Sequence, residues 1–188
     1  SQRPRGLAQK YYPVKIDVIP NGINLAKYPK TPSTLQNPPM ILFIGRFSPE
    51  KNSQLVPKVL SHISDMDWKC KMIGDGLQKE LVQRLITEHS LDNRIELTGW
   101  ISPDKVDRAL LDCDILLMPS LGEGMPMAGL QALASGAALI MSNVGACQDM
   151  VDVGKNGYLT QPGDEIGYAA AIRKLLEEPS KIKDFKNH

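Results

Sequence analysis

Short apolar runs of strand length alternate with helical patterns along the chain, and this alternation limits the fold more than any other feature. Between and after the runs, the spacing of apolar residues predicts helices over 52–64, 77–89, 103–112, 126–135, 146–151 and 164–178. The apolar runs themselves are Ile16–Ile19, Met40–Ile44, Trp68–Ile73, Ile95–Thr98, Ile115–Met118 and Ala138–Met141. We therefore expect an α/β fold, a Rossmann-like doubly wound parallel sheet of about six strands.

Local signals mark several helix ends. Pro126 predicts the first position of one helix and Gly136 predicts its end. Asp164 is an expected N-cap residue. Pro57 lies inside the 52–64 pattern, so that helix is either kinked or begins later.

Composition and charge exclude several classes of protein. The 188 residues carry 22 Lys+Arg and 21 Asp+Glu, and this balance argues against broad electrostatic binding to nucleic acid. No apolar run approaches the roughly 18 residues of a membrane span. Cys70, Cys113 and Cys147 lie far apart, which favours reduced thiols over a disulfide framework or zinc site. The Asp-x-Asp pairs at 65–67 and 112–114 precede their strands, away from the expected ligand edge, and predict no metal.

Residues directly after each apolar run form the candidate site, because ligands of such sheets bind at the carboxyl ends of the strands. Gly45 with Arg46 and Lys51 suits an anion, although two solvated surface cations fit the spacing equally well. Gly74 opens a Gly-Asp-Gly sequence that lacks the third glycine of a dinucleotide fingerprint, so a tight turn is favoured. Trp100 either stacks on a base or packs against the core.

The strongest local signal is the glycine-rich loop of residues 119–129, which leads into a helix. Free N–H groups and the positive end of a helix meet there, and both favour an anion. Glu123 stands in this loop, where its carboxylate is placed to accept hydrogen bonds from sugar hydroxyls. No Gly-x4-Gly-Lys-Ser/Thr sequence occurs, so a Walker-type phosphate loop is absent.

Taken in order, these segments resemble the C-terminal, donor-binding domain of glycosyltransferase family 4, the group 1 retaining enzymes of the GT-B fold. The resemblance covers nearly the whole chain and implies one half of a GT-B architecture. It rests on six segments in the family's order, at residues 18–23, 45–51, 73–76, 97–99, 114–124 and 154–159.

The resemblance implies a role for each candidate residue. Arg46 and Lys51 would neutralise the donor diphosphate, and Glu123 would contact the transferred sugar; these three are the expected catalytic residues. Trp100 and Ile101 would border the base. The expected donor-binding residues are Gly45, Gly74, Trp100, Ile101, Gly124, Met125, Pro126, Met127, Ala128 and Gln131.

One position departs from the family's pattern. A second glutamate, which grips the ribose in the family, is expected where this sequence has Gln131. Losing a charged acceptor costs on the order of 1–2 kcal/mol, or roughly tenfold in donor affinity. We expect the enzyme to tolerate this change. The alternatives are a degenerate nucleotide-sugar-binding module or another GT-B enzyme such as a nucleotide-sugar epimerase; a nicotinamide-binding domain is disfavoured.

The resemblance also implies that the chain is one part of a larger enzyme. Residues 1–14 resemble a linker remnant from a missing N-terminal domain, 15–178 the nucleotide-sugar-binding domain, and 179–188 a truncated tail. The full-length protein would be a hexosyltransferase-like enzyme of glycan or polysaccharide biosynthesis, and the fragment alone would be inactive. Transfer would be retaining and metal-independent, to an acceptor held by the missing domain.

The resemblance also implies what the protein binds and where it acts. The substrate would be a nucleotide-sugar such as a UDP- or GDP-sugar, and no cofactor is expected. We expect a cytoplasmic protein without a transmembrane segment, with peripheral association of the full-length enzyme at the cytoplasmic face of a membrane.

Overall fold

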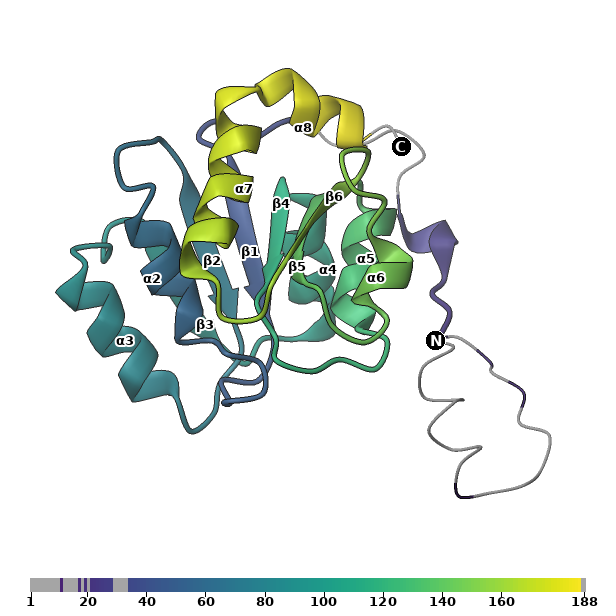
Figure 1. The fold of residues 1–188 in the computed structure, drawn as a ribbon, viewed down its shortest axis with the longest axis horizontal. Coiled ribbons are helices and arrows are strands. Elements are labelled where there is room, and N and C mark those ends of the chain that lie inside the picture. Colours follow the sequence, from purple (N-terminus) through teal and green to yellow (C-terminus); the bar gives the residue numbers. More distant parts are fainter. Residues whose placement is uncertain (1–10, 12–16, 18, 20, 29–33, 187–188) are drawn as a thin grey trace.

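The protein is built around a six-stranded parallel sheet, seen in a computed structural model that describes residues 11, 17, 19, 21–28 and 34–186 (Figure 1). The strand order is β3-β2-β1-β4-β5-β6, and every neighbouring pair is parallel. The strands are β1 Met40–Ile44, β2 Lys69–Ile73, β3 Ile95–Gly99, β4 Ile115–Met118, β5 Ala138–Ser142 and β6 Gly157–Thr160. This confirms the predicted α/β class.

Helices cover both faces of the sheet, as a doubly wound fold requires. One buried cluster joins the sheet to α2, α3, α7 and α8, and a second joins it to α4, α5 and α6. The α-helices are α2 Leu55–Ser61, α3 Lys79–Glu88, α4 Pro103–Leu111, α5 Met127–Ala134, α6 Cys147–Met150, α7 Glu165–Glu177 and α8 Pro179–Lys186, and a short 3-10 helix, η1, spans Leu25–Lys27. Within the described ranges, no helix is both long and apolar enough to cross a membrane.

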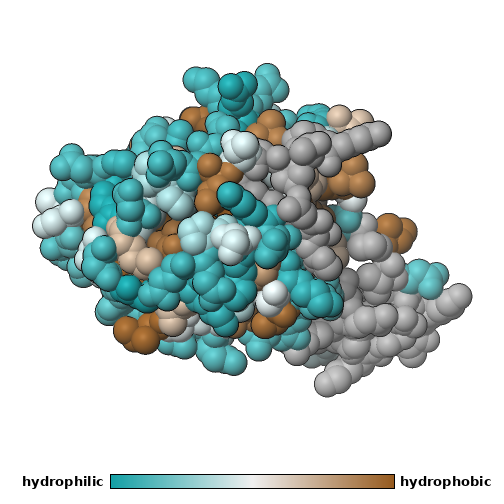
Figure 2. Space-filling view, turned by 90° about the horizontal axis from the view of Figure 1, so that it is seen from above, coloured by the Kyte–Doolittle hydropathy of each residue, from teal (hydrophilic) through white to brown (hydrophobic). Residues whose placement is uncertain are grey.

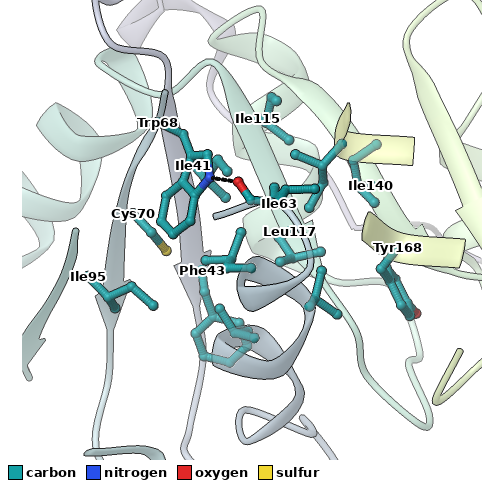
Figure 3. Close-up of a cluster of buried hydrophobic side chains, with 14 of the residues drawn as sticks. Ile41, Phe43, Ile63, Trp68, Cys70, Ile95, Ile115, Leu117, Ile140 and Tyr168 are labelled. Carbon is teal, nitrogen blue, oxygen red and sulfur yellow. Dashed lines mark hydrogen bonds between the residues drawn. The ribbon is translucent and has the colours of Figure 1, made fainter. Parts of the chain in front are cut away.

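Successive residues of the central strands belong to opposite clusters. Ile41 and Phe43 pack in the first cluster while Leu42 packs in the second, so β1 needs apolar side chains at every position. Figure 3 shows part of the first cluster, where the indole Nε1 of Trp68 donates to the Ile63 carbonyl oxygen at 2.8 Å. The face seen in Figure 2 is mostly hydrophilic, with apolar residues in small separate patches.

The strand predictions succeeded except at the two ends of the series. The predicted strand Ile16–Ile19 lies mostly outside the described residues, and neither Asp17 nor Ile19 is in a strand. The sixth strand is instead β6, whose sequence Gly-Tyr-Leu-Thr has no apolar run. It lies at an edge of the sheet and buries only its first and last residues, Gly157 and Thr160, neither of which extends an apolar run.

The positions of Pro57 and Pro126 follow from where α2 and α5 begin. α2 begins at Leu55, so Pro57 lies in the first turn, where its missing N–H has no helical acceptor to lose. Pro126 is the N-cap residue of α5 rather than its first helical residue, which corrects the prediction by one position. The Asp164 carboxylate caps α7 as expected, accepting from Gly167 N at 2.9 Å.

The C-terminal segment is part of the packed fold. Residues 179–186 form α8, and Ile182 and Phe185 are buried in the first cluster. The segment was expected to be a tail, and its helical pattern was not recognised.

At the amino edge of the sheet, where the amino ends of the strands lie, two carboxylates form hydrogen bonds within the protein. Asp114 is fully buried and accepts from Met40 N at 2.8 Å and from Gln36 N at 3.2 Å. The Arg173 guanidinium binds both carboxylate oxygens of Asp65, and this bond lowers the pKa of Asp65. Residues of both Asp-x-Asp pairs therefore have structural partners.

Candidate functional site

The loops that follow the parallel strands lie along one edge of the sheet. They comprise residues 45–54 after β1, 74–78 after β2, 100–102 after β3, 119–126 after β4 and 143–146 after β5. The predicted site residues are thus gathered at the carboxyl edge, as the parallel arrangement requires.

The loops after β1 and β2 are bound tightly to each other. Gly45 N donates to Ile73 O at 3.0 Å and Phe47 N donates to Asp75 O at 2.9 Å. A Cβ atom on Gly74 would lie 1.9 Å from the Gly45 carbonyl oxygen, and the φ of Gly74 is +143°. The glycine is therefore required by the close approach of two loops, a more specific reason than the predicted tight turn.

Asp75 stiffens the second of these loops. Its carboxylate accepts from Lys79 Nζ at 2.8 Å and from Gly76 N at 2.7 Å. These two bonds, the lysine first, lower the pKa of Asp75. The carboxylate therefore stays ionised and keeps the loop beside Phe47 in one conformation.

The two predicted cations differ in their surroundings. Arg46 is exposed and forms no ion pair with any described residue. Lys51 is mostly buried, with 28% of its side chain exposed, and its Nζ lies 2.7 Å from Glu123 Oε1. The alternative of a solvated surface cation therefore fails for Lys51. Arg46 remains free to meet an anion from solvent.

Glu123 is a nearly buried carboxylate, with 6% of its side chain exposed. Its Oε1 accepts from both Lys51 Nζ and Ser120 Oγ, each at 2.7 Å. Leu121 N donates to Glu50 O at 2.8 Å, which ties the loop after β4 to the loop after β1. Ser120 was not predicted as a site residue; the available signal was a serine three residues before an acidic residue in a glycine-rich loop.

The loop after β5 supports Glu123 from its backbone side. Gly145 has φ +52°, and a Cβ atom there would lie 1.8 Å from the Glu123 carbonyl oxygen. Ala146 N donates to Gly124 O at 3.1 Å.

Burial, with the Glu123 carboxylate as the next cause, raises the pKa of the Cys147 thiol to about 12. That thiol is therefore protonated and unreactive at neutral pH.

The start of α5 offers open backbone donors. Pro126 has no side chain that can cap the helix, and Gly129 N and Leu130 N both donate back to its carbonyl oxygen. The N–H groups of Met127 and Ala128 donate to no group within the described residues. Together with the positive end of the helix, they are suited to an anion.

Two further residues frame this helix. Gln131 lies on the second turn, half-buried, and its side chain makes no hydrogen bond to a described residue. Its predicted contact with a ribose stays a prediction. Asn21, from the opening segment, donates from Nδ2 to the Met125 carbonyl oxygen at 3.1 Å, a contact that the sequence did not predict.

The two residues predicted to border a base differ in exposure. Trp100 is 69% exposed, so the core-packing alternative is wrong and its ring is accessible. Ile101 is half-buried against the second cluster and lines a hollow of about 500 Å³ between β3 and α4, together with Thr98 and Lys105. Of these two residues, Trp100 is the one that presents a broad apolar surface to solvent.

Comparisons with known proteins agree on one family. The model of the family described as glycosyl transferases group 1 matches residues 27–188. The 2-deoxystreptamine glucosyltransferase of Streptomyces kanamyceticus is 24% identical over 180 residues, covering 89% of this chain and 46% of that protein. The chain thus spans about half the length of the curated relatives it matches.

Two solved structures have the same fold. A mutant of S. aureus TarM in complex with fondaparinux, alpha-GlcNAc-glycerol and UDP gives a TM-score of 0.86 at 20% identity, over 99% of this chain and 38% of that one. Anabaena HepE in complex with UDP-glucose gives 0.79 at 21% identity, over 91% and 50%.

Proposed function

Because the chain belongs to the group 1 glycosyl transferases, as a C-terminal domain of that family, we propose that it binds a nucleoside-diphosphate sugar as the glycosyl donor. The observation that carries this proposal is the convergence, at one sheet edge, of an unpaired cation, open helix N–H groups and a fixed carboxylate. These are Arg46, the start of α5 and Glu123.

The anionic part of the donor fits the start of α5 and Arg46. A diphosphate carries the charge that the open N–H groups of Met127 and Ala128 are oriented to receive. Charge grows on the diphosphate as its bond to the sugar breaks, so Arg46 would stabilise the transition state more than the bound donor. Because these groups belong to the protein, we propose that transfer is metal-independent.

The sugar and the base fit the two sides of this centre. Glu123 would accept hydrogen bonds from hydroxyls of the transferred sugar, and the exposed ring of Trp100 would stack on the base. UDP and UDP-glucose, which are bound by the two structural neighbours, are the first ligands to test.

The donor-binding experiment uses Trp100 as its reporter. Titration with UDP, UDP-glucose and GDP should quench its fluorescence, and NAD should not, while buried Trp68 supplies a constant background. The Trp100→Phe variant is the control and should show no quenching. Calorimetry in EDTA and in Mg²⁺ should give the same affinity. Absence of binding to every nucleoside diphosphate would contradict the proposal.

We further propose that the acceptor is bound by a part of the protein outside residues 1–188, and that transfer retains the anomeric configuration. The share of the curated relatives covered, 46%, supports the first statement. The 188 residues alone should bind donor and transfer no sugar to added acceptors. Transfer by this chain alone would disprove the need for a further part, and an inverted product from the full-length enzyme would disprove retention.

The second candidate is a nucleotide-sugar-binding module without turnover, and Gln131 is the residue that favours it. The two candidates predict the same binding results for this chain. A full-length protein that binds donor but neither transfers the sugar nor hydrolyses the donor would decide for the module.

A further inference from the structure

The carboxylate of Glu123 is held by donors on one oxygen only. Lys51 Nζ and Ser120 Oγ both donate to Oε1 at 2.7 Å, whereas no described residue donates to Oε2. With 6% of the side chain exposed, water can replace these donors poorly. A nearly buried carboxylate without partners is strongly disfavoured, so the two donors determine where the group sits.

The two donors differ in how firmly they are placed. Ser120 is 2% exposed and lies two residues after the end of β4, so its short side chain has little freedom to move. Lys51 reaches the same oxygen through a long flexible side chain from the loop after β1. Ser120 is therefore the donor that sets the rotamer of Glu123, and Lys51 chiefly compensates its charge.

The backbone of Glu123 is constrained independently. The close approach of Gly145 to the Glu123 carbonyl oxygen restricts that peptide. A fixed backbone and two donors on Oε1 leave Oε2 as the carboxylate oxygen without a described donor.

We propose that Ser120 is a positioning residue of the sugar subsite: it orients Glu123 so that Oε2 accepts a hydroxyl of the donor sugar. This inference rests on the proposed function. It separates two parts of the site, because Ser120 acts on the sugar through Glu123 and has no effect on the nucleotide, which Arg46 and α5 bind.

The experiment compares the affinities of UDP and of UDP-sugars by calorimetry, using UDP-glucose, UDP-galactose and UDP-N-acetylglucosamine and keeping the one that binds most tightly. Ser120→Ala should weaken the UDP-sugar about five- to tenfold. It should change UDP affinity less than about twofold. Ser142→Ala is the matched control, because Ser142 is also fully buried and bonds one side chain, the Tyr168 hydroxyl, at 2.6 Å.

A double-mutant cycle shows whether Ser120 acts through Glu123. In the Glu123→Ala background, Ser120→Ala should have no further effect on UDP-sugar affinity. Ser120→Cys, which keeps the shape of the side chain with a weaker donor, should fall between wild type and Ser120→Ala.

The outcomes separate the inference from its premise. Equal weakening of UDP and UDP-sugar would overturn the inference, because Ser120 would then support the whole loop. An unchanged UDP-sugar affinity, or additive effects in the cycle, would also overturn it. A wild-type chain that binds neither ligand overturns the proposed function, and the inference with it.

Discussion

The two edges of the sheet carry similar charged and polar residues, but these differ in whether they have hydrogen-bond partners within the described residues. At the amino edge, Asp114 accepts two backbone N–H groups and Asp65 is bound by Arg173. At the carboxyl edge, Arg46 has no described partner and the helix start at Met127 has open N–H groups. Polar groups satisfied within the chain contribute to stability, and those left open are available to a ligand.

The two tryptophans show the same contrast. Trp68, beside the amino edge, is fully buried, with its N–H bonded to Ile63 and the Arg94 guanidinium 3.7 Å from its ring centroid. Trp100, at the carboxyl edge, is 69% exposed. Residue type alone therefore does not separate core from site; position relative to the strand direction does.

The largest effect that tests this contrast is expected at the amino edge. Asp114→Ala would leave the partly buried N–H groups of Met40 and Gln36 without their acceptor and a cavity in place of a fully buried side chain, so we expect a loss of about 2–4 kcal/mol in the free energy of unfolding. Urea denaturation measures this loss. UDP affinity below the melting range should not change.

Asp112→Ala is the matched control, from the same Asp-x-Asp pair. Its side chain is 58% exposed, and its ion pair with Arg108 is at 4.0 Å. We expect a change within about 0.5 kcal/mol. Equal effects at Asp112 and Asp114 would remove the distinction between a buried and a surface carboxylate at this edge.

At the carboxyl edge, the expected effect is on binding instead of stability. Arg46→Ala should weaken UDP by about 10- to 100-fold, the value of one charged hydrogen bond of roughly 1.5–3 kcal/mol. The melting temperature should stay the same because Arg46 has no described partner to lose. Calorimetry and thermal denaturation measure the two quantities.

Arg84→Ala controls for the loss of an exposed guanidinium. Arg84 is 66% exposed on α3 and should affect neither quantity. If Arg46→Ala lost as much free energy of unfolding as free energy of UDP binding, residues of the carboxyl edge would also stabilise the fold.

A smaller effect is expected at Gln131. Gln131→Glu places a charged acceptor on the second turn of α5, where the family has its second glutamate, and should tighten UDP by up to about tenfold. Calorimetry of the two proteins decides the point. Unchanged affinity would mean that residue 131 does not contact the ribose.

The smallest expected effect is on acid stability. The Arg173 hydrogen bonds hold the pKa of Asp65 below its ordinary value, so the stabilisation is complete above about pH 4 and is lost as pH falls through the lowered pKa. Asp65→Asn should therefore lose less melting temperature than wild type between pH 5 and 2.5. Glu80→Gln, at an exposed carboxylate without a described partner, should follow wild type; identical curves for all three would refute the prediction.

The sequence predicted the central strands and the loops at their carboxyl ends because both follow from one rule. A parallel strand covered on both faces must be apolar throughout, and its carboxyl end must point to the ligand edge. β6 was missed because its sequence, Gly-Tyr-Leu-Thr, has only two apolar residues in succession.

The pairings within the site were not predicted for a different reason. Lys51 and Glu123 are 72 positions apart, and their contact depends on the register of β1 with β4 and on side-chain rotamers. Ser120 gave only a weak signal, because serine is common in loops. The chemistry of the residues was readable from the chain, whereas their partners depended on tertiary packing.

The strand order has a consequence for how the chain reaches its native state. β1, β2 and β3 are neighbours in both sequence and space, so this half of the sheet forms through contacts of short sequence separation. β4 must then pair with the other side of β1, and only that step brings Glu123 to Lys51. The first cluster is completed by Phe185, near the end of the described chain. Pairing of β4 with β1 closes a long loop, so we expect the ligand edge to form after the half of the sheet built from β1, β2 and β3.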